Sequence, residues 1–176
     1  MTDSDVFIHD TADVDPGATL GDGTRVWNWV QVRENATIGR HCVLAKGVYV
    51  DAGVRIGDFV KIQNNVSLFA GVTVGDGAFI GPHVVFTNDL RPRAVSPDMT
   101  PLDARGWTVS ETRVGRGASI GAGSVIVAGV TLGEWCLVAA GCTVTRDVPA
   151  YALVMGSPAR QVGWVDARGN RTPGPS

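Results

Sequence analysis

Residues 50–80 read VDAGVRIGDFVKIQNNVSLFAGVTVGDGAFI, and an aliphatic side chain returns at every sixth position of this stretch. A small or β-branched side chain follows four positions after each aliphatic one, from Val54 through Ala78. A period of six fits neither the helical period of about 3.6 residues nor the alternation of a half-buried strand. The stretch therefore predicts a parallel β-helix in which each hexad forms a short strand and a turn. The paired apolar side chains would point inward.

The same rhythm extends outward from Ile8 to Phe86 and resumes from Val114 to Val144. The third position after each aliphatic residue is most often Gly, and Asn stands there twice, as Asn35 and Asn65. Gly and Asn tolerate a positive φ at the lowest cost, so a tight corner is expected once in every hexad. The three cysteines all occupy the small position of a hexad and are expected to be core fillers: Cys42, Cys136 and Cys142.

The composition fits one ordered domain, expected over residues 1–165. The 176 residues carry a formal net charge of −2, with 44% hydrophobic and 18% charged residues. Disorder is excluded by this balance, and no strong field attracts nucleic acid or an anionic membrane. Neither a membrane-spanning stretch nor a secretory signal is recognised, so a cytoplasmic location is expected.

Two segments break the rhythm. The interval from Phe86 to Val114 is not a multiple of six, and a loop is expected over residues 87–107, with the coil restarting near Trp107. A loop of this length inside a compact repeat is usually functional or disordered. Residues 149–165 are expected to form an exit turn and a short cap over the last coil. Residues 166–176 are expected to be a disordered tail.

Four strings carry a resemblance to a known family: Lys61–Ser67 (KIQNNVS), Gly81–Asp89 (GPHVVFTND), Pro92–Ala94 (PRA) and Gly156–Arg160 (GSPAR). Their order and spacing resemble those of the nucleotide-amino-sugar N-acetyltransferases of the hexapeptide-repeat acyltransferases. The resemblance implies a left-handed β-helix with three hexads in each coil, hence six to seven coils, and a homotrimer. It also implies that acetyl-CoA donates an acetyl group to the C3 amine of a UDP- or dTDP-linked 3-amino-3-deoxy sugar. No metal is expected.

The resemblance and the spacing of the coils together indicate roles for individual residues. Asn88 is the first candidate to contact the reacting amine, with turn capping as the alternative, and His83 is a candidate general base that would lie directly over Asn65. Glu34 lies three whole coils from Asn88, about 14 Å along one column, and is a candidate nucleotide or sugar contact. Gln63, Asn64 and Asn65 are candidates for the sugar or for an amide ladder between coils, and Asp89 for a sugar hydroxyl or a loop cap. Arg91 and Arg93 are candidates for the diphosphate, with a solvated loop as the alternative. Ala122 and Ala140 are candidates for the pantetheine arm of CoA, and Arg160 for a CoA phosphate.

Three other functions stay open. An O-acetyltransferase would act on a small acceptor without a nucleotide. A hexapeptide-fold zinc enzyme of the carbonic anhydrase type would need three convergent histidines, but His41 and His83 lie on different columns. A non-enzymatic scaffold or binding module would need no active site. The sequence leaves open the nucleotide, the substituents at C4 to C6 of the sugar and the pathway that uses the product.

Overall fold

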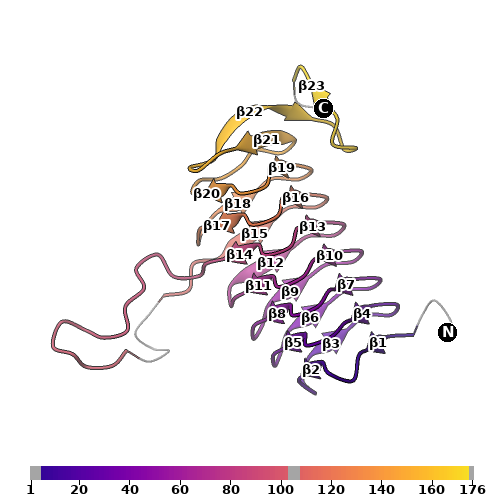
Figure 1. The fold of residues 1–176 in the computed structure, drawn as a ribbon, viewed down its shortest axis with the longest axis vertical. Helices are drawn as coiled ribbons and strands as arrows, with labels where there is room; N and C mark the ends of the chain where they lie inside the picture. The colour runs from indigo at the N-terminus through magenta and orange to yellow at the C-terminus, as the bar shows by residue number, and fades with distance from the viewer. Residues whose placement is uncertain (1–4, 103–107, 175–176) are drawn as a thin grey trace.

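The computed structural model describes residues 5–102 and 108–174, which wind into a β-solenoid with three parallel sheets and one projecting loop (Figure 1). Strands and turns make up the described residues, and none of them forms a helix able to cross a membrane. The predicted hexapeptide-repeat left-handed β-helix is confirmed.

Each of the first six turns of the solenoid places one strand in each sheet. Sheet A contains β1 (Phe7–Ile8), β4 (Arg25–Val26), β7 (Val43–Leu44), β10 (Lys61–Ile62), β13 (Phe79–Ile80), β16 (Ser119–Ile120), β19 (Leu137–Val138) and β21 (Ala152–Met155), followed by β22 (Arg160–Val165) and β23 (Arg171–Thr172). Sheet B contains β2 (Asp13–Val14), β5 (Gln31–Val32), β8 (Tyr49–Val50), β11 (Ser67–Leu68), β14 (Val85–Phe86), β17 (Val125–Ile126) and β20 (Thr143–Val144). Sheet C contains β3 (Thr19–Leu20), β6 (Thr37–Ile38), β9 (Arg55–Ile56), β12 (Val72–Val74), β15 (Thr112–Val114) and β18 (Thr131–Leu132).

Three edges join these sheets. We call them the AB edge, which includes residues 63–66, 81–84, 121–124 and 139–142, the BC edge, which includes 33–36, 51–54 and the loop, and the CA edge, which includes 39–42 and 57–60. Strands in neighbouring turns pair in parallel at a step of three hexads, as in Phe7 with Arg25. Across the loop the step is larger, because Val85 pairs with Val125 and the whole insertion lies between them.

The interior of the column holds the aliphatic and small residues of the hexads, as predicted. Leu44, Ile62 and Leu68 are fully buried, and so are Cys42 and Val66 at the small or β-branched position. The first turn is the exception, because Ile8 is 44% exposed at the N-terminal end of the column. One continuous apolar core therefore runs from the second turn to the cap.

The expected corners are present, with a positive φ at every sixth residue through most of the column. Besides Gly and Asn, several bulky residues adopt this conformation: Trp29, His41, Phe59, His83 and Trp135. A left-handed conformation costs such residues about 1 kcal/mol or more. Their side chains project from the edges of the prism, so the bulk meets no steric barrier in the core.

The loop leaves the column after β14 at the BC edge (Figure 1). The Thr87 amide still donates to the Ile126 carbonyl (2.9 Å), and the Ser110 amide donates to the Asn88 carbonyl (3.1 Å), which closes the base of the loop. The ladder resumes with β15. The predicted restart near Trp107 lies outside the described residues.

The C-terminal segment differs from the expectation in two respects. β21 pairs in parallel with β19 at a step shorter than three hexads, so sheet A receives strands from eight successive turns rather than the six to seven expected. The hexad count missed this turn because its spacing is irregular. Residues 166–174 were expected to be disordered, but β22 pairs antiparallel with β21 and β23 pairs with β22. The Asp166 carboxylate orders the connection by accepting from the Arg168 and Asn170 amides (both 2.9 Å).

The buried cysteines should resist thiol reagents in the native protein. Burial raises the pKa of the Cys136 thiol to about 12 and also raises the pKa of Cys42, so little reactive thiolate exists at pH 8. We expect a chromogenic disulfide reagent to label none of the three cysteines natively and all three in denaturant. Rapid labelling of the native protein would contradict the packing described here.

Candidate functional site

The AB edge carries one group of the predicted residues. His83 lies one turn above Asn65, and its amide donates to the Asn64 carbonyl (2.9 Å). Ala122 and Ala140 continue the same edge in the next two turns, where the Gly141 amide donates to the Ala122 carbonyl (2.8 Å). His83 and both alanines are exposed.

In the two turns above His83, the AB edge carries no large side chain at its corners. Gly123 and Gly141 occupy the corners with φ of 68° and 71°, and a Cβ atom built at either position would meet no atom within 4 Å. Together with Ala122 and Ala140 they leave the backbone accessible over two turns. The edge therefore forms a shallow track that leads to His83, and an extended chain such as pantetheine can lie along it.

The BC edge carries the second group. The strand register places Glu34 and Asn88 on this edge three turns apart, as predicted, and Asp89, Arg91 and Arg93 follow in the first part of the loop. Asn88 is half-buried and its carbonyl closes the loop base. Asn88, Asp89, Arg91 and Arg93 therefore lie at the root of the loop, whereas Glu34 lies three turns below it and Gln63, Asn64 and Asn65 lie on the AB edge.

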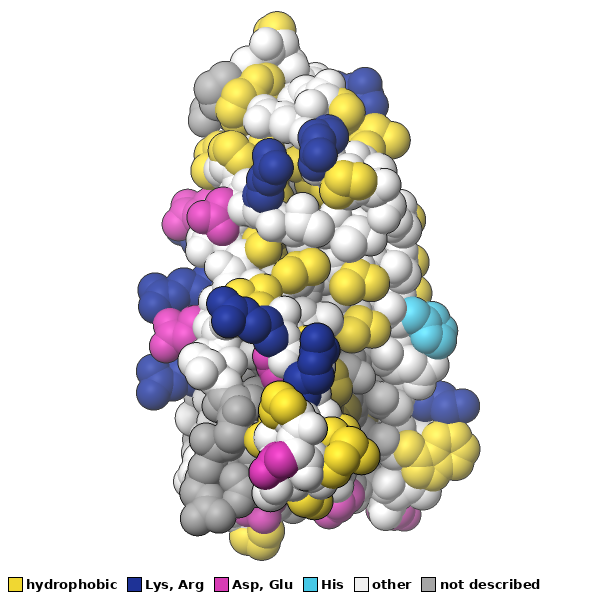
Figure 2. Space-filling view, turned by 90° about the vertical axis from the view of Figure 1, so that its left-hand side faces the viewer, with side chains coloured by type: hydrophobic (Ala, Val, Ile, Leu, Met, Phe, Trp, Pro, Cys, Tyr) yellow, Lys and Arg dark blue, Asp and Glu magenta, His cyan; other side chains and the backbone are white. Residues whose placement is uncertain are grey.

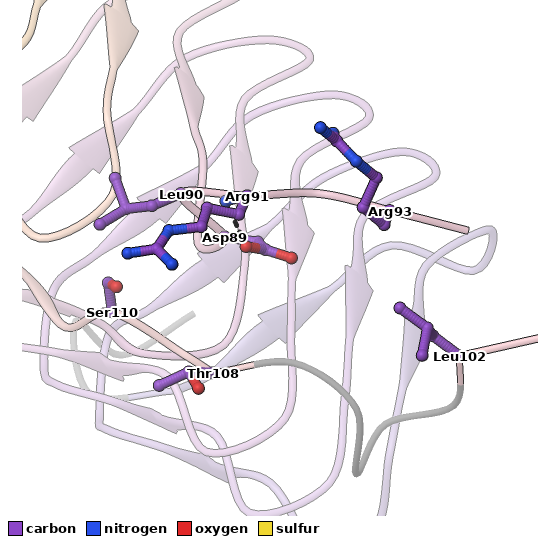
Figure 3. A pocket seen from close by; sticks show the side chains of 7 residues that line it. All are labelled: Asp89, Leu90, Arg91, Arg93, Leu102, Thr108 and Ser110. Atoms are coloured by element: carbon purple, nitrogen blue, oxygen red, sulfur yellow. Dashed lines mark hydrogen bonds between the residues drawn. The ribbon is translucent and has the colours of Figure 1, made fainter. Parts of the chain in front are cut away.

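A pocket of about 410 Å³ opens at this root (Figure 3). The Asp89 carboxylate accepts from the Arg91 amide (2.7 Å), which fixes the first turn of the loop. In Figure 3 the Arg91 side chain extends toward Ser110, whereas the Arg93 side chain points away from it. The pocket is lined by Asp89, Leu90, Arg91, Arg93, Leu102, Thr108 and Ser110.

His83 and Asn88 do not meet within one chain. β14 lies between them, so they stand at opposite edges of sheet B in the same turn. The outward side of this sheet is apolar in its upper turns, where Val85, Val125 and Val127 are half-buried. Figure 2, which views the side from which the loop projects, shows hydrophobic side chains along its middle and cationic side chains beside them.

The side chain of Arg33 holds the carboxylate of Glu34 in place. The Glu34 carboxylate accepts two hydrogen bonds from the Arg33 guanidinium (2.9 and 3.1 Å). Its own backbone amide, and then Arg33, lower the pKa of the carboxyl, so Glu34 is ionised at neutral pH. In the next turn the Tyr49 hydroxyl donates to Asp51 (3.0 Å). Sequence reasoning did not select Tyr49 and Asp51, although the three-hexad register places them directly above Gln31 and Arg33.

Arg160 does not lie on the AB edge. The Ala159 amide donates to the Thr143 carbonyl (2.8 Å), so the start of β22 runs beside β20 of sheet B. There Arg160 and Arg146 line one pocket of about 270 Å³. Sequence reasoning selected only the first of these two arginines.

The histidines do not converge within the chain. His41 lies on the CA edge, His83 lies on the AB edge, and His9 contacts Asn28 (3.0 Å) near the N-terminal end. In residues 5–102 and 108–174, no group of three or more metal-ligating side chains is found.

Comparisons with known proteins place the chain among transferases with the same repeat. The family described as "Bacterial transferase hexapeptide (six repeats)" matches residues 17–52, 53–88 and 111–146. A dTDP-3-amino-3,6-dideoxy-alpha-D-galactopyranose 3-N-acetyltransferase from Aneurinibacillus thermoaerophilus is 61% identical over 54 residues, which are 31% of this chain and 28% of that protein. The bifunctional protein GlmU from Alkalilimnicola ehrlichii is 33% identical over 155 residues, which are 82% of this chain and 32% of that protein.

Among solved structures, a variant of perosamine N-acetyltransferase from Caulobacter crescentus in complex with CoA and GDP-perosamine is similar at a TM-score of 0.54 and 26% identity, over 90% of this chain and 56% of that one. The chain spans less than a third of the length of the curated relatives described above. The three matched stretches of the six-repeat family together cover more than half of the chain, so the protein belongs to the bacterial transferase hexapeptide family.

Proposed function

We propose that the protein is an acetyl-CoA-dependent N-acetyltransferase whose acceptor is the C3 amine of a nucleotide-linked 3-amino-3-deoxy sugar. The observation that carries the proposal is the bare track on the AB edge, which ends at His83 in the same turn that projects the loop with Asn88. A linear thioester donor fits the track, and a polar acceptor fits the loop root. The matched segment of the dTDP-3-amino-sugar N-acetyltransferase supports this acceptor class.

A homotrimer would complete the site. If three prisms face a common axis with sheet B, the AB edge of one chain lies beside the BC edge of its neighbour. The half-buried valines on sheet B favour burial of this side. His83 and the CoA track of one subunit would then lie opposite Asn88 and the loop of the next.

The chemistry follows from this placement. The neutral amine attacks the thioester carbonyl, the C–S bond breaks, and the CoA thiolate leaves. The side-chain amide of Asn88 can orient the amine, and His83 can accept the proton from its nitrogen and return it to the thiolate. Asp89 and Glu34 stay candidates for the sugar or nucleotide, Gln63, Asn64 and Asn65 for the sugar, Arg91 and Arg93 for the diphosphate, and Arg160 for a phosphate of CoA.

A thiol-release assay with acetyl-CoA and a panel of amino sugars tests this function. Activity with UDP- or dTDP-linked 3-amino sugars supports it. Turnover with a nucleotide-free hydroxyl acceptor such as serine or maltose, and none with amino sugars, would favour an O-acetyltransferase. Absence of acetyl-CoA binding would favour a scaffold.

Asn88→Ala should lower kcat/KM for the amino sugar by about a hundredfold, because the amine loses the group that orients it. The assay measures initial rates of thiol release. Asn170→Ala, in the remote C-terminal connection, is the control and should keep the wild-type rate. Wild-type turnover by Asn88→Ala would remove this residue from the mechanism.

His83→Asn should lower kcat by about a hundredfold or more, because the proton acceptor is lost while Asn tolerates the φ of 60° at this corner. Mixing this variant with Asn88→Ala should restore part of the activity, since about a quarter of the sites in random mixed trimers carry both intact side chains. Two active single variants, or no recovery in verified mixed trimers, would contradict a site shared between subunits.

A further inference from the structure

A groove on the outward side of sheet C carries a cluster of arginines that the proposed mechanism does not use. Its volume is about 570 Å³, and it spans three successive turns beside the loop root. Its charged side chains are Arg55, Arg113, Arg116 and Glu111.

The strand register sets the spacing of the cations. Arg55 and Arg113 both pair with Thr73, one from the turn below and one from the turn above. Their Cα atoms therefore stand two strand separations apart, or about 10 Å. The Thr73 hydroxyl group lies between them in the outward row, and Arg116 follows at the next corner. The long Arg side chains can converge over Thr73, so that both guanidinium groups contact one ligand with two adjacent anionic groups.

The charge balance of the groove also favours an anion. The Arg113 guanidinium pairs with the Glu111 carboxylate (2.8 Å), and both side chains are largely exposed. Arg113 and then Arg55 lower the pKa of Glu111. Three arginines and one glutamate leave two net positive charges, whereas the loop-root pocket has one, from Arg91, Arg93 and Asp89.

Glycines make the floor of the groove. Gly53 has a φ of 69°, and a Cβ atom there would meet nothing within 4 Å, so the lower end is open. A Cβ atom at Gly71 would clash with the Val109 side chain, because the returning end of the loop lies against this glycine. The groove and the loop-root pocket thus share the segment from Thr108 to Glu111 as a common wall.

We propose that this groove, in place of Arg91 and Arg93, binds the diphosphate of the nucleotide-linked acceptor, with the loop-root pocket left for the sugar. The diphosphate in such a ligand carries one negative charge on each phosphate, which matches the net charge of the groove. CoA also contains a diphosphate, and in the proposed trimer the CoA track of a neighbouring subunit would lie beside this edge, so the test compares CoA with UDP and dTDP. The identity of the ligand rests on the proposed function, while binding of a nucleoside diphosphate does not require turnover.

The test measures binding of UDP and dTDP to the full chain by isothermal titration calorimetry. Arg55→Ala and Arg116→Ala should each weaken binding of the preferred nucleotide by about tenfold or more. Glu111→Gln should tighten it several-fold, because a negative charge leaves the groove, and a gain of this kind cannot come from misfolding. Arg25→Ala is the matched control: Arg25 also opens a two-residue strand on the outside of the column, but on sheet A, and its loss should change nothing.

Three results would overturn the assignment. One is unchanged nucleotide affinity in both groove variants, particularly if Arg91→Ala or Arg93→Ala abolishes binding. Another is an equal loss in the Arg25→Ala control. The third is CoA affinity that falls in the groove variants while UDP and dTDP affinities stay constant.

Kinetics separate this assignment from the proposed function. If the enzyme acetylates amino sugars but Arg55→Ala keeps the wild-type KM for the acceptor, only the groove assignment fails. If no amino sugar is acetylated although UDP or dTDP binds in an arginine-dependent manner, the groove stands and the proposed acceptor fails.

Discussion

The structure depends on burying one aliphatic and one small side chain from every hexad in a narrow three-sided interior. Each wall is only a short strand, so no single turn has a core of its own. Stability arises when turns stack, because parallel ladders and the inward column of Leu44, Ile62 and Ile80 extend through neighbouring turns. The positive φ at the corners is the local cost of turning the chain within so short a segment.

This constraint explains why the fold was predictable from the sequence. The hexad rhythm identified the inward residues, the corner positions and the place where the chain departs from the column. The six-residue rhythm constrains only the inward residues, so it does not predict which exposed side chains lie together. The relation between Arg55 and Arg113 was hidden because the insertion shifts the register, and the size of that shift becomes clear only when Val85 is seen beside Val125. The order of residues 166–174 was missed because it comes from polar turn bonds at Asp166 rather than from buried apolar residues.

The candidate site was predicted only in part, for a related reason. The sequence placed His83 over Asn65 and Glu34 in the column of Asn88, since both relations follow from the three-hexad turn. It did not show that these two columns form different edges of the prism. Because of that separation, the residues proposed to bind donor and acceptor face in different directions on one chain, and the proposed reaction requires an assembly of several chains.

The closure of the loop base has a consequence for specificity. One hydrogen bond, from the Ser110 amide to the Asn88 carbonyl, returns the chain to the position from which it left. None of the described residues between Asn88 and Ser110 belongs to the buried core, so the excursion can be lengthened, shortened or exchanged without repacking the interior. Under the proposed function, acceptor choice is thereby decoupled from folding, and a loop transplanted between Asn88 and Ser110 would bring its own preferences to an unaltered framework.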